Sequence, residues 1–195
     1  MEKPKYLTME ELFLKIDEPY RSQCWKIYLD NLELFHVVQG STNNHQNWRG
    51  GYHDHIVEVL NIAVLLYDLL GSARPHPFSL SDTLVILFLH DIEKPWKYEL
   101  RADGELYHIP SMQKKADQHA FREKKLEGYG IMLTPAQANA LKYVEGEGDD
   151  YSSRHRVMNE LASFCHMCDS WSARGWHGYP LAENDPWTGA KRSGG

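Results

Sequence analysis

The apolar run from Thr83 to Leu89 ends in the dipeptide His90-Asp91, and this junction constrains the fold more than any other feature of the chain. A run this apolar predicts a segment buried in the core. An imidazole and a carboxylate side by side at its end suit a transition metal such as Zn, Mn, Fe, Co or Ni, because buried polar groups need a partner. A capping Asp beside a chance His is the alternative. The metal interpretation therefore requires ligands from other segments.

The composition is that of one folded domain. The chain has 195 residues, of which 42% are hydrophobic and 25% charged, and these fractions are typical of globular proteins. We expect a single helical domain over residues 1–174, followed by a tail, residues 175–195, in which Gly, Pro and Trp interrupt the helical pattern. The formal net charge of −6 gives no support to broad nucleic-acid binding, which usually needs a basic face.

The sequence favours a cytoplasmic location without a membrane partner. The N-terminus has no apolar leader, and no later run approaches the roughly 20 apolar residues that span a bilayer. Three cysteines, an odd number, argue against a disulfide framework and fit a reducing compartment. Cys165 and Cys168 have Cys-x-x-Cys spacing without a second pair, so we expect them to pack in the core.

Helical periodicity dominates the chain and predicts an all-α fold. The longest expected helix, residues 53–70, is nearly apolar all round and should be central. Ser79 or Ser81 can cap the helix that ends at His90-Asp91. Residues 96–108 alternate around 102–104, which predicts a small β-hairpin. The remaining expected helices cover residues 12–16, 25–35, 112–126, 135–144 and 153–174.

Two further positions could supply metal ligands from these helices. His55 lies near the start of the long apolar helix. Asp169 follows Cys165 by four residues, so it borders the buried stripe of the last helix, where a lone acid is unusual unless it is paired or binds something. His53 competes with His55, but residues two apart on a helix point to nearly opposite sides, so only one of them can face a metal directly.

Three short segments, all between Asn44 and Arg174, together resemble the HD-domain superfamily of metal-dependent phosphohydrolases. They are Gly50-Gly51-Tyr52-His53-Asp54-His55, Leu89-His90-Asp91-Ile92-Glu93-Lys94, and Met167 to Arg174 around Asp169. The resemblance implies an HD-domain helical bundle and an enzyme that hydrolyses a phosphate ester or anhydride. The metal shell that it implies consists of His55, His90, Asp91 and Asp169.

The resemblance also implies one divalent metal, Zn, Mn, Co, Ni or Fe, and catalytic roles for nearby residues. Lys94 follows Asp91 by three residues and could neutralise phosphate oxygens. Members with two metals have two further His; His108 could match the first, but the second falls near Glu145, which could serve as a ligand or as a general base. One metal is therefore the primary expectation, and a second metal held by His108 and Glu145 is the alternative.

The sequence predicts substrate-contacting residues less specifically than metal ligands. After Lys94, the candidate cations are Arg49 and Arg21, and the candidate aromatic contacts include Trp48 and Tyr52, which lie near the expected site in sequence. His45 is either a polar residue near the substrate pocket or a surface loop residue. A nucleotide is the leading class among small phosphorylated substrates, because small HD proteins often act on nucleotides.

The sequence is compatible with two other functions. It does not predict the oligomeric state. One is an HD-fold di-iron oxygenase that uses the second metal position. The other is a non-catalytic HD module that binds a nucleotide or a partner. One fold can host several chemistries, so the geometry of the site is needed to distinguish these functions.

Overall fold

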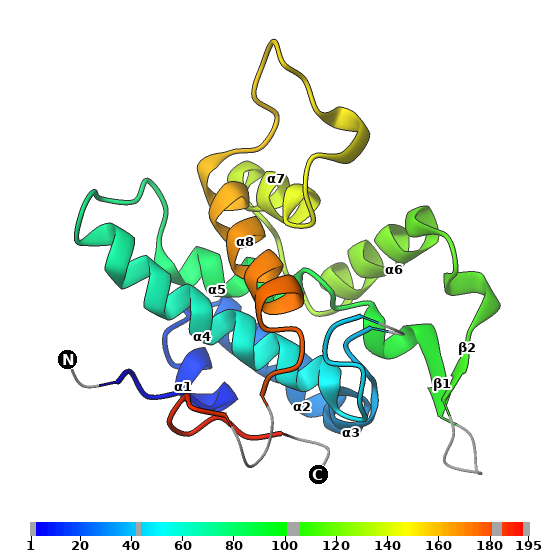
Figure 1. Cartoon of the computed structure of the whole chain (residues 1–195). Coiled ribbons are helices and arrows are strands. Elements are labelled where there is room, and N and C mark those ends of the chain that lie inside the picture. Colours follow the sequence, from blue (N-terminus) through cyan, green and yellow to red (C-terminus); the bar gives the residue numbers. More distant parts are fainter. Residues whose placement is uncertain (1–2, 42–43, 101–105, 181–184, 193–195) are drawn as a thin grey trace.

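The computed structural model describes residues 3–41, 44–100, 106–180 and 185–192, which form an all-α fold with one small sheet (Figure 1), as the sequence predicts. Among these residues, no helix has the length and apolar character needed to cross a membrane. The helices are α1 (Met9–Phe13), α2 (Tyr20–Asp30), α3 (Leu32–Val37), α4 (Gly51–Gly71), α5 (Leu80–Leu89), α6 (Lys115–Gly128), α7 (Pro135–Tyr143) and α8 (Glu160–Ser170).

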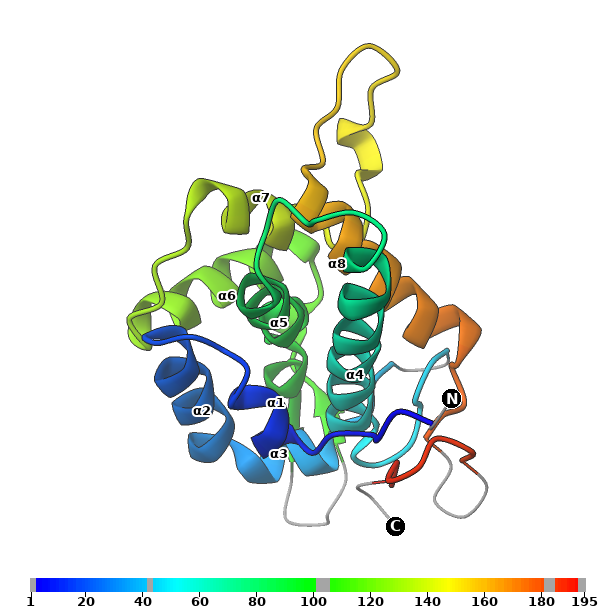
Figure 2. The same ribbon diagram turned by 90° about the vertical axis from the view of Figure 1, so that its left-hand side faces the viewer.

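Helix α5 forms the centre of the core. Every residue from Leu84 to Leu89 is fully buried, and α5 packs against both α4 and α8 (Figures 1 and 2). The expectation that the longest helix is central holds only for its N-terminal half. Residues 54–63 of α4 are buried, whereas Leu65, Leu69 and Leu70 near its C-terminal end are exposed.

The starts of α4 and α5 show how the sequence positions these two helices. Ser79 caps α5 and forms a capping box with Asp82, which satisfies backbone N–H groups at the helix start. Gly50, which precedes α4, has φ of 77°, a left-handed conformation that favours glycine. Gly51 packs directly on the preceding loop, since a Cβ atom there would lie 1.8 Å from the carbonyl oxygen of Gln46.

Two expected helices differ from the observed ones. The helix expected over 25–35 is divided at Asn31, whose side-chain amide donates to the Ile27 carbonyl oxygen and so ends α2. The helix expected from residue 153 begins only at Glu160, because Asn159 supplies the N-cap. The polar segment between α7 and α8 instead projects away from the helical body in both views (Figures 1 and 2).

A two-stranded antiparallel sheet and the tail complete the described structure. Strands β1 (Tyr98–Leu100) and β2 (Leu106–His108) pair as the expected hairpin, while its turn, residues 102–104, lies outside the described residues. The tail packs against the N-terminal segment (Figure 2): the amide of Tyr6 donates to the carbonyl oxygen of Thr188 at 2.8 Å, and the two rings of Tyr6 and Trp187 meet edge to face.

Candidate metal centre

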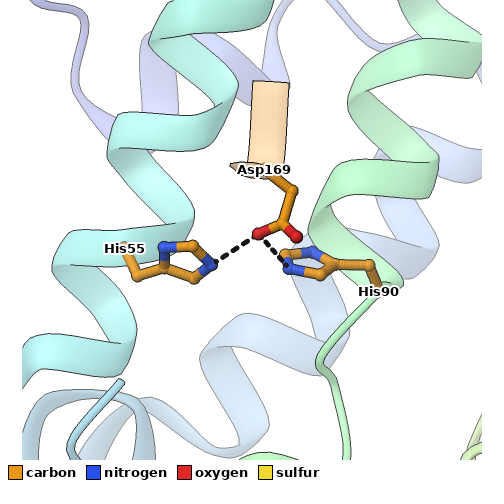
Figure 3. A group of neighbouring side chains, drawn as sticks. All are labelled: His55, His90 and Asp169. Atoms are coloured by element: carbon orange, nitrogen blue, oxygen red, sulfur yellow. Dashed lines mark ion pairs between the residues drawn. The ribbon is translucent and has the colours of Figure 1, made fainter. Parts of the chain in front are cut away.

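Three helices bring His55, His90 and Asp169 together in the interior (Figure 3). His55 belongs to α4, His90 caps the C-terminal end of α5, and Asp169 lies near the end of α8. Oδ1 of Asp169 lies 3.2 Å from Nε2 of His55 and 3.4 Å from Nε2 of His90. The three side chains offer ligand atoms within 4.8 Å of one another, so this group could hold a metal ion.

The hydrogen bonds of the two imidazoles leave one nitrogen of each directed at this point. Nδ1 of His90 donates to the carbonyl oxygen of Leu87 at 2.7 Å, and Nδ1 of His55 lies 3.1 Å from Oγ of Ser172. Both Nε2 atoms are buried and make no well-formed hydrogen bond among the described residues; what they face is carboxylate oxygen, of Asp169 and, for His90, also of Asp91. A metal ion placed between these nitrogens and the carboxylates would satisfy both nitrogens at once. The donor set therefore fits a metal.

Asp91 lies at the edge of this group. Its Oδ2 is 3.2 Å from Nε2 of His90 and 3.8 Å from Nε2 of His55, and the same oxygen contacts the ammonium of Lys94. The Asp91 carboxylate thus lies between the imidazole of His90, which could bind a metal, and the ammonium of Lys94, which attracts the carboxylate. Within the described residues, the group with ligand atoms close enough for a metal is His55, His90 and Asp169.

Charge at the centre is strongly coupled. Burial opposes ionisation of Asp169, but both imidazoles outweigh it and hold the pKa of this carboxyl well below its usual range. Burial lowers the pKa of His55. In His90 burial acts in the same direction, yet Asp91 and Asp169 prevail and raise the pKa of its imidazole. Without an ion, the excess negative charge is therefore balanced by a proton on His90 and by Lys94.

A cavity of about 700 Å³ adjoins the centre. His90, Asp91 and Asp169 form part of its wall, and Lys94 and Arg174 supply two cations. The wall thus combines metal-ligating groups with positive charges, which is the arrangement that an anionic ligand requires. The other ionisable side chains of the wall are His45, Glu145, His166 and His177.

His45 belongs to this wall rather than to an isolated surface loop. Its ring centre lies 4.6 Å from that of His55, and its Nδ1 bonds to Oε1 of Gln46 at 2.8 Å. Burial, followed by repulsion from His55 and Lys94, lowers the pKa of His45 to about 4. The imidazole is therefore neutral near pH 7 and can accept a proton or a hydrogen bond.

The structure places several predicted contacts elsewhere. Tyr52 is fully buried against Phe35 in the core, and Trp48 donates to Asp54. Arg49 is exposed and Arg21 pairs with Glu18, and neither arginine lines the cavity. These assignments rested on closeness in sequence, which does not fix the direction in which a side chain points. His53, the competitor of His55, instead stacks on the ring of His36, 4.2 Å between centres.

The second-metal assignment joins two residues that line different cavities. Glu145 lines the cavity beside the centre and pairs with Lys115 at 3.0 Å. His108 lines a smaller cavity with Lys97, and its ring packs on Tyr98. Among the described residues, neither belongs to a group of side chains that could hold a metal. The structure therefore corrects the expectation that His108 and Glu145 form one site.

Sequence reasoning missed His166, Arg174 and Ser172. His166 precedes Asp169 by three residues on α8, a spacing that places both on one helix face and could have identified it. Arg174 and Ser172 lie in a π-helical segment, Trp171–Gly175, whose wider turn cannot be foreseen from an α-helical period. Cys165 and Cys168 are buried in the core, as expected.

Comparisons with known proteins give no assignment. No family model matches the chain, and no curated protein or solved structure matches it. Function must therefore be argued from the site itself.

Proposed function

We propose that this chain is a metal-dependent phosphohydrolase of the HD-domain kind, which cleaves a phosphate ester or anhydride, with a nucleotide as the leading substrate class. One observation carries the proposal. Two buried imidazole nitrogens that make no well-formed hydrogen bond meet a carboxylate beside a cavity whose wall also presents Lys94 and Arg174. A dianionic phosphate fits a site that combines a divalent cation with two positive side chains.

His55, His90 and Asp169 would hold the ion, and Asp91 is placed to join them. Imidazole and carboxylate ligands suit Zn, Mn, Co, Ni or Fe. A bound divalent ion lowers the pKa of a coordinated water and polarises a phosphoryl oxygen. Three or four protein ligands leave coordination positions for that chemistry.

The remaining wall residues have roles that follow from their charge. Lys94 is held against Asp91, and this attraction raises the pKa of its ammonium although burial opposes it, so the side chain stays cationic. Lys94 and Arg174 can then neutralise phosphate oxygens as negative charge develops on them. Glu145 is the candidate to accept a proton from the attacking water, and the neutral His45 can accept a hydrogen bond from it.

The proposal is tested by metal reconstitution followed by a phosphate-release screen. Chelator-treated protein is loaded separately with each of the five metals and assayed with nucleoside mono-, di- and triphosphates, a sugar phosphate and an aryl phosphate. We expect metal-dependent phosphate release that is lost in Asp169→Asn, which removes a ligand charge while keeping the side-chain size. Turnover that is insensitive to chelation, or equal in the variant, would contradict the proposal.

Two other outcomes of the same screen would replace it. Two equivalents of iron with oxygen consumption would indicate an oxygenase, although the separation of His108 from Glu145 gives that chemistry no support. Saturable nucleotide binding without turnover under any metal would indicate a non-catalytic module.

A further inference from the structure

A network of buried polar side chains contacts His55 on the side away from the metal centre. Oγ of Ser172 lies 3.1 Å from Nδ1 of His55 and donates to Oε2 of Glu58 at 2.6 Å. The amide of Gln46 donates to the same Oε2 at 3.0 Å and approaches Oγ of Ser172 at 3.3 Å. All four side chains are at least 98% buried, so water cannot replace these contacts without rearrangement.

The carbonyl oxygen of Tyr179 orients the side-chain amide of Gln46, and the directions of the other hydrogen bonds in this polar network follow from it. Nε2 of Gln46 lies 3.0 Å from the carbonyl oxygen of Tyr179, which can only accept, so this atom of the amide is the NH₂ group. Oε2 of Glu58 then accepts from Gln46 and accepts the hydroxyl proton of Ser172, so any proton that this carboxyl holds must be on Oε1. Because that hydroxyl has only one proton to donate, its oxygen accepts from His55, which places the imidazole proton on Nδ1.

Local backbone geometry brings the side chains of this polar network together. Glu58 follows His55 by three residues on α4, so both side chains lie on the same helix face. Ser172 comes three residues after Asp169 but lies in the π-helical segment Trp171–Gly175, whose wider turn lets Asp169 and Ser172 approach opposite sides of one imidazole. The backbone amide of Gln46 donates to the carbonyl oxygen of His177 at 2.8 Å, which anchors the loop.

We propose that Ser172, Glu58 and Gln46 form a positioning network that fixes His55 with its proton on Nδ1 and its Nε2 lone pair directed at the metal. The proposal rests on the proposed metal site and assigns it a support that reaches into the loop before α4 and the segment after α8. Outer partners of this kind orient the ligand ring and select its tautomer, and their loss typically lowers metal affinity about 10- to 100-fold.

The first test compares the metal affinity of two serine variants. Ser172→Ala removes the hydroxyl next to His55, whereas Ser163→Ala makes the same chemical change at an exposed position of α8. Zn²⁺ affinity is measured by competition with a chromophoric chelator. We expect Ser172→Ala to bind about 10- to 100-fold more weakly and Ser163→Ala to match the wild type. Equal affinity in all three proteins would overturn the proposal.

Replacement of Glu58 separates its hydrogen-bonding role from its volume. Glu58→Gln keeps an acceptor oxygen that can take the place of Oε2, so we expect Zn²⁺ affinity within a few-fold of the wild type. Glu58→Met has similar length without an acceptor, and we expect a loss like that of Ser172→Ala. Circular dichroism verifies that both variants fold. A folded Glu58→Met protein with wild-type affinity would overturn the role of Glu58.

The tautomer itself can be read without metal, which separates this proposal from the proposed function. Long-range ¹H–¹⁵N NMR spectra of metal-free protein distinguish an imidazole protonated on Nδ1 from one protonated on Nε2. We expect a proton on Nδ1 of His55 in the wild type, whether or not Nε2 also carries one towards Asp169, and loss of the Nδ1 proton in Ser172→Ala. A proton on Nε2 alone in the wild type would overturn the network, whether or not the protein binds metal or hydrolyses phosphate.

Discussion

At the scale of single residues, the metal centre depends on which nitrogen of each imidazole already makes a hydrogen bond. Leu87 and Ser172 occupy Nδ1 of His90 and His55, so each ring presents Nε2 to Asp169. The sequence identified both imidazoles and the carboxylate, because each departs from an apolar helix face. It could not identify their hydrogen-bond partners, since Ser172 is more than 110 residues from His55 in the chain.

Lys94 provides a prediction about charge at the cavity. Lys94→Met keeps the length of the side chain and removes its charge, so metal stoichiometry should be unchanged. The rate of phosphate release should fall about 100- to 1,000-fold, as for loss of one electrostatic donor to a transition state. Lys26→Met, at an exposed ion pair on α2, is the matched control. Unchanged turnover in Lys94→Met would remove Lys94 from the mechanism.

Glu58 provides a prediction about pH. Burial, with smaller contributions from Asp185 and Asp54, raises the pKa of its carboxyl from 4.5 to about 8, although Ser172 and Gln46 oppose the shift. The folded state therefore holds this proton more tightly than the unfolded state does. Its contribution to stability is fully present below pH 4.5 and is lost as the pH rises towards 8, by at most about 1.4 kcal/mol per pH unit.

Urea unfolding of metal-free protein at several pH values checks this sign. Glu58→Gln lacks the titrating group and serves as the reference. The free energy of unfolding of the wild type, relative to that of Glu58→Gln, should decrease from pH 5 to pH 8. A difference that stays constant or grows over this range would show that Glu58 is ionised in the folded protein.

At the scale of elements, the starts and ends of helices place the functional groups. The sequence predicted α4, α5 and α7 well, because their apolar spacing and caps agree. It misjudged the start of α8, which depends on the Asn159 N-cap and on the hydrogen bond that the backbone amide of Asn159 donates to Oδ1 of Asn139. Such a contact between distant segments leaves no trace in local periodicity.

The contact of Gly51 with the preceding loop gives a prediction at this scale. In Gly51→Ala the new Cβ would meet the Gln46 carbonyl oxygen at 1.8 Å, so the loop must shift. We expect the free energy of unfolding to fall by about 1–3 kcal/mol, together with weaker Zn²⁺ binding because Gln46 belongs to the positioning network. Both are measured by urea unfolding and chelator competition.

Gly128→Ala is the control for this substitution. Gly128 ends α6, and a Cβ atom there would meet nothing within 4 Å. Its stability and Zn²⁺ affinity should match or slightly exceed those of the wild type. If Gly51→Ala behaved in the same way, the close packing of α4 on its loop would not be needed for the site.

At the scale of the whole molecule, the fold converges three helices on one point and opens a charged cavity beside it. The all-α class and the hairpin followed from periodicity, whereas the HD-domain bundle stays a prediction that rests on three short segments. Trp48 and Tyr52, predicted as substrate contacts, do not line the cavity, because nearness in sequence does not give the direction of a side chain. Arg174 reaches the cavity through a π-helical turn that the sequence does not reveal.

Metal content shows whether His55, His90 and Asp169 form a metal site. Purified wild-type protein and Asp169→Asn are each stripped with chelator, reconstituted with Zn, Mn, Co, Ni or Fe, and analysed for metal per chain by mass spectrometry. We expect about one tightly bound equivalent in the wild type and its loss in a folded Asp169→Asn protein. A wild type that retains no metal under any condition, or a variant that retains the full equivalent, would contradict it.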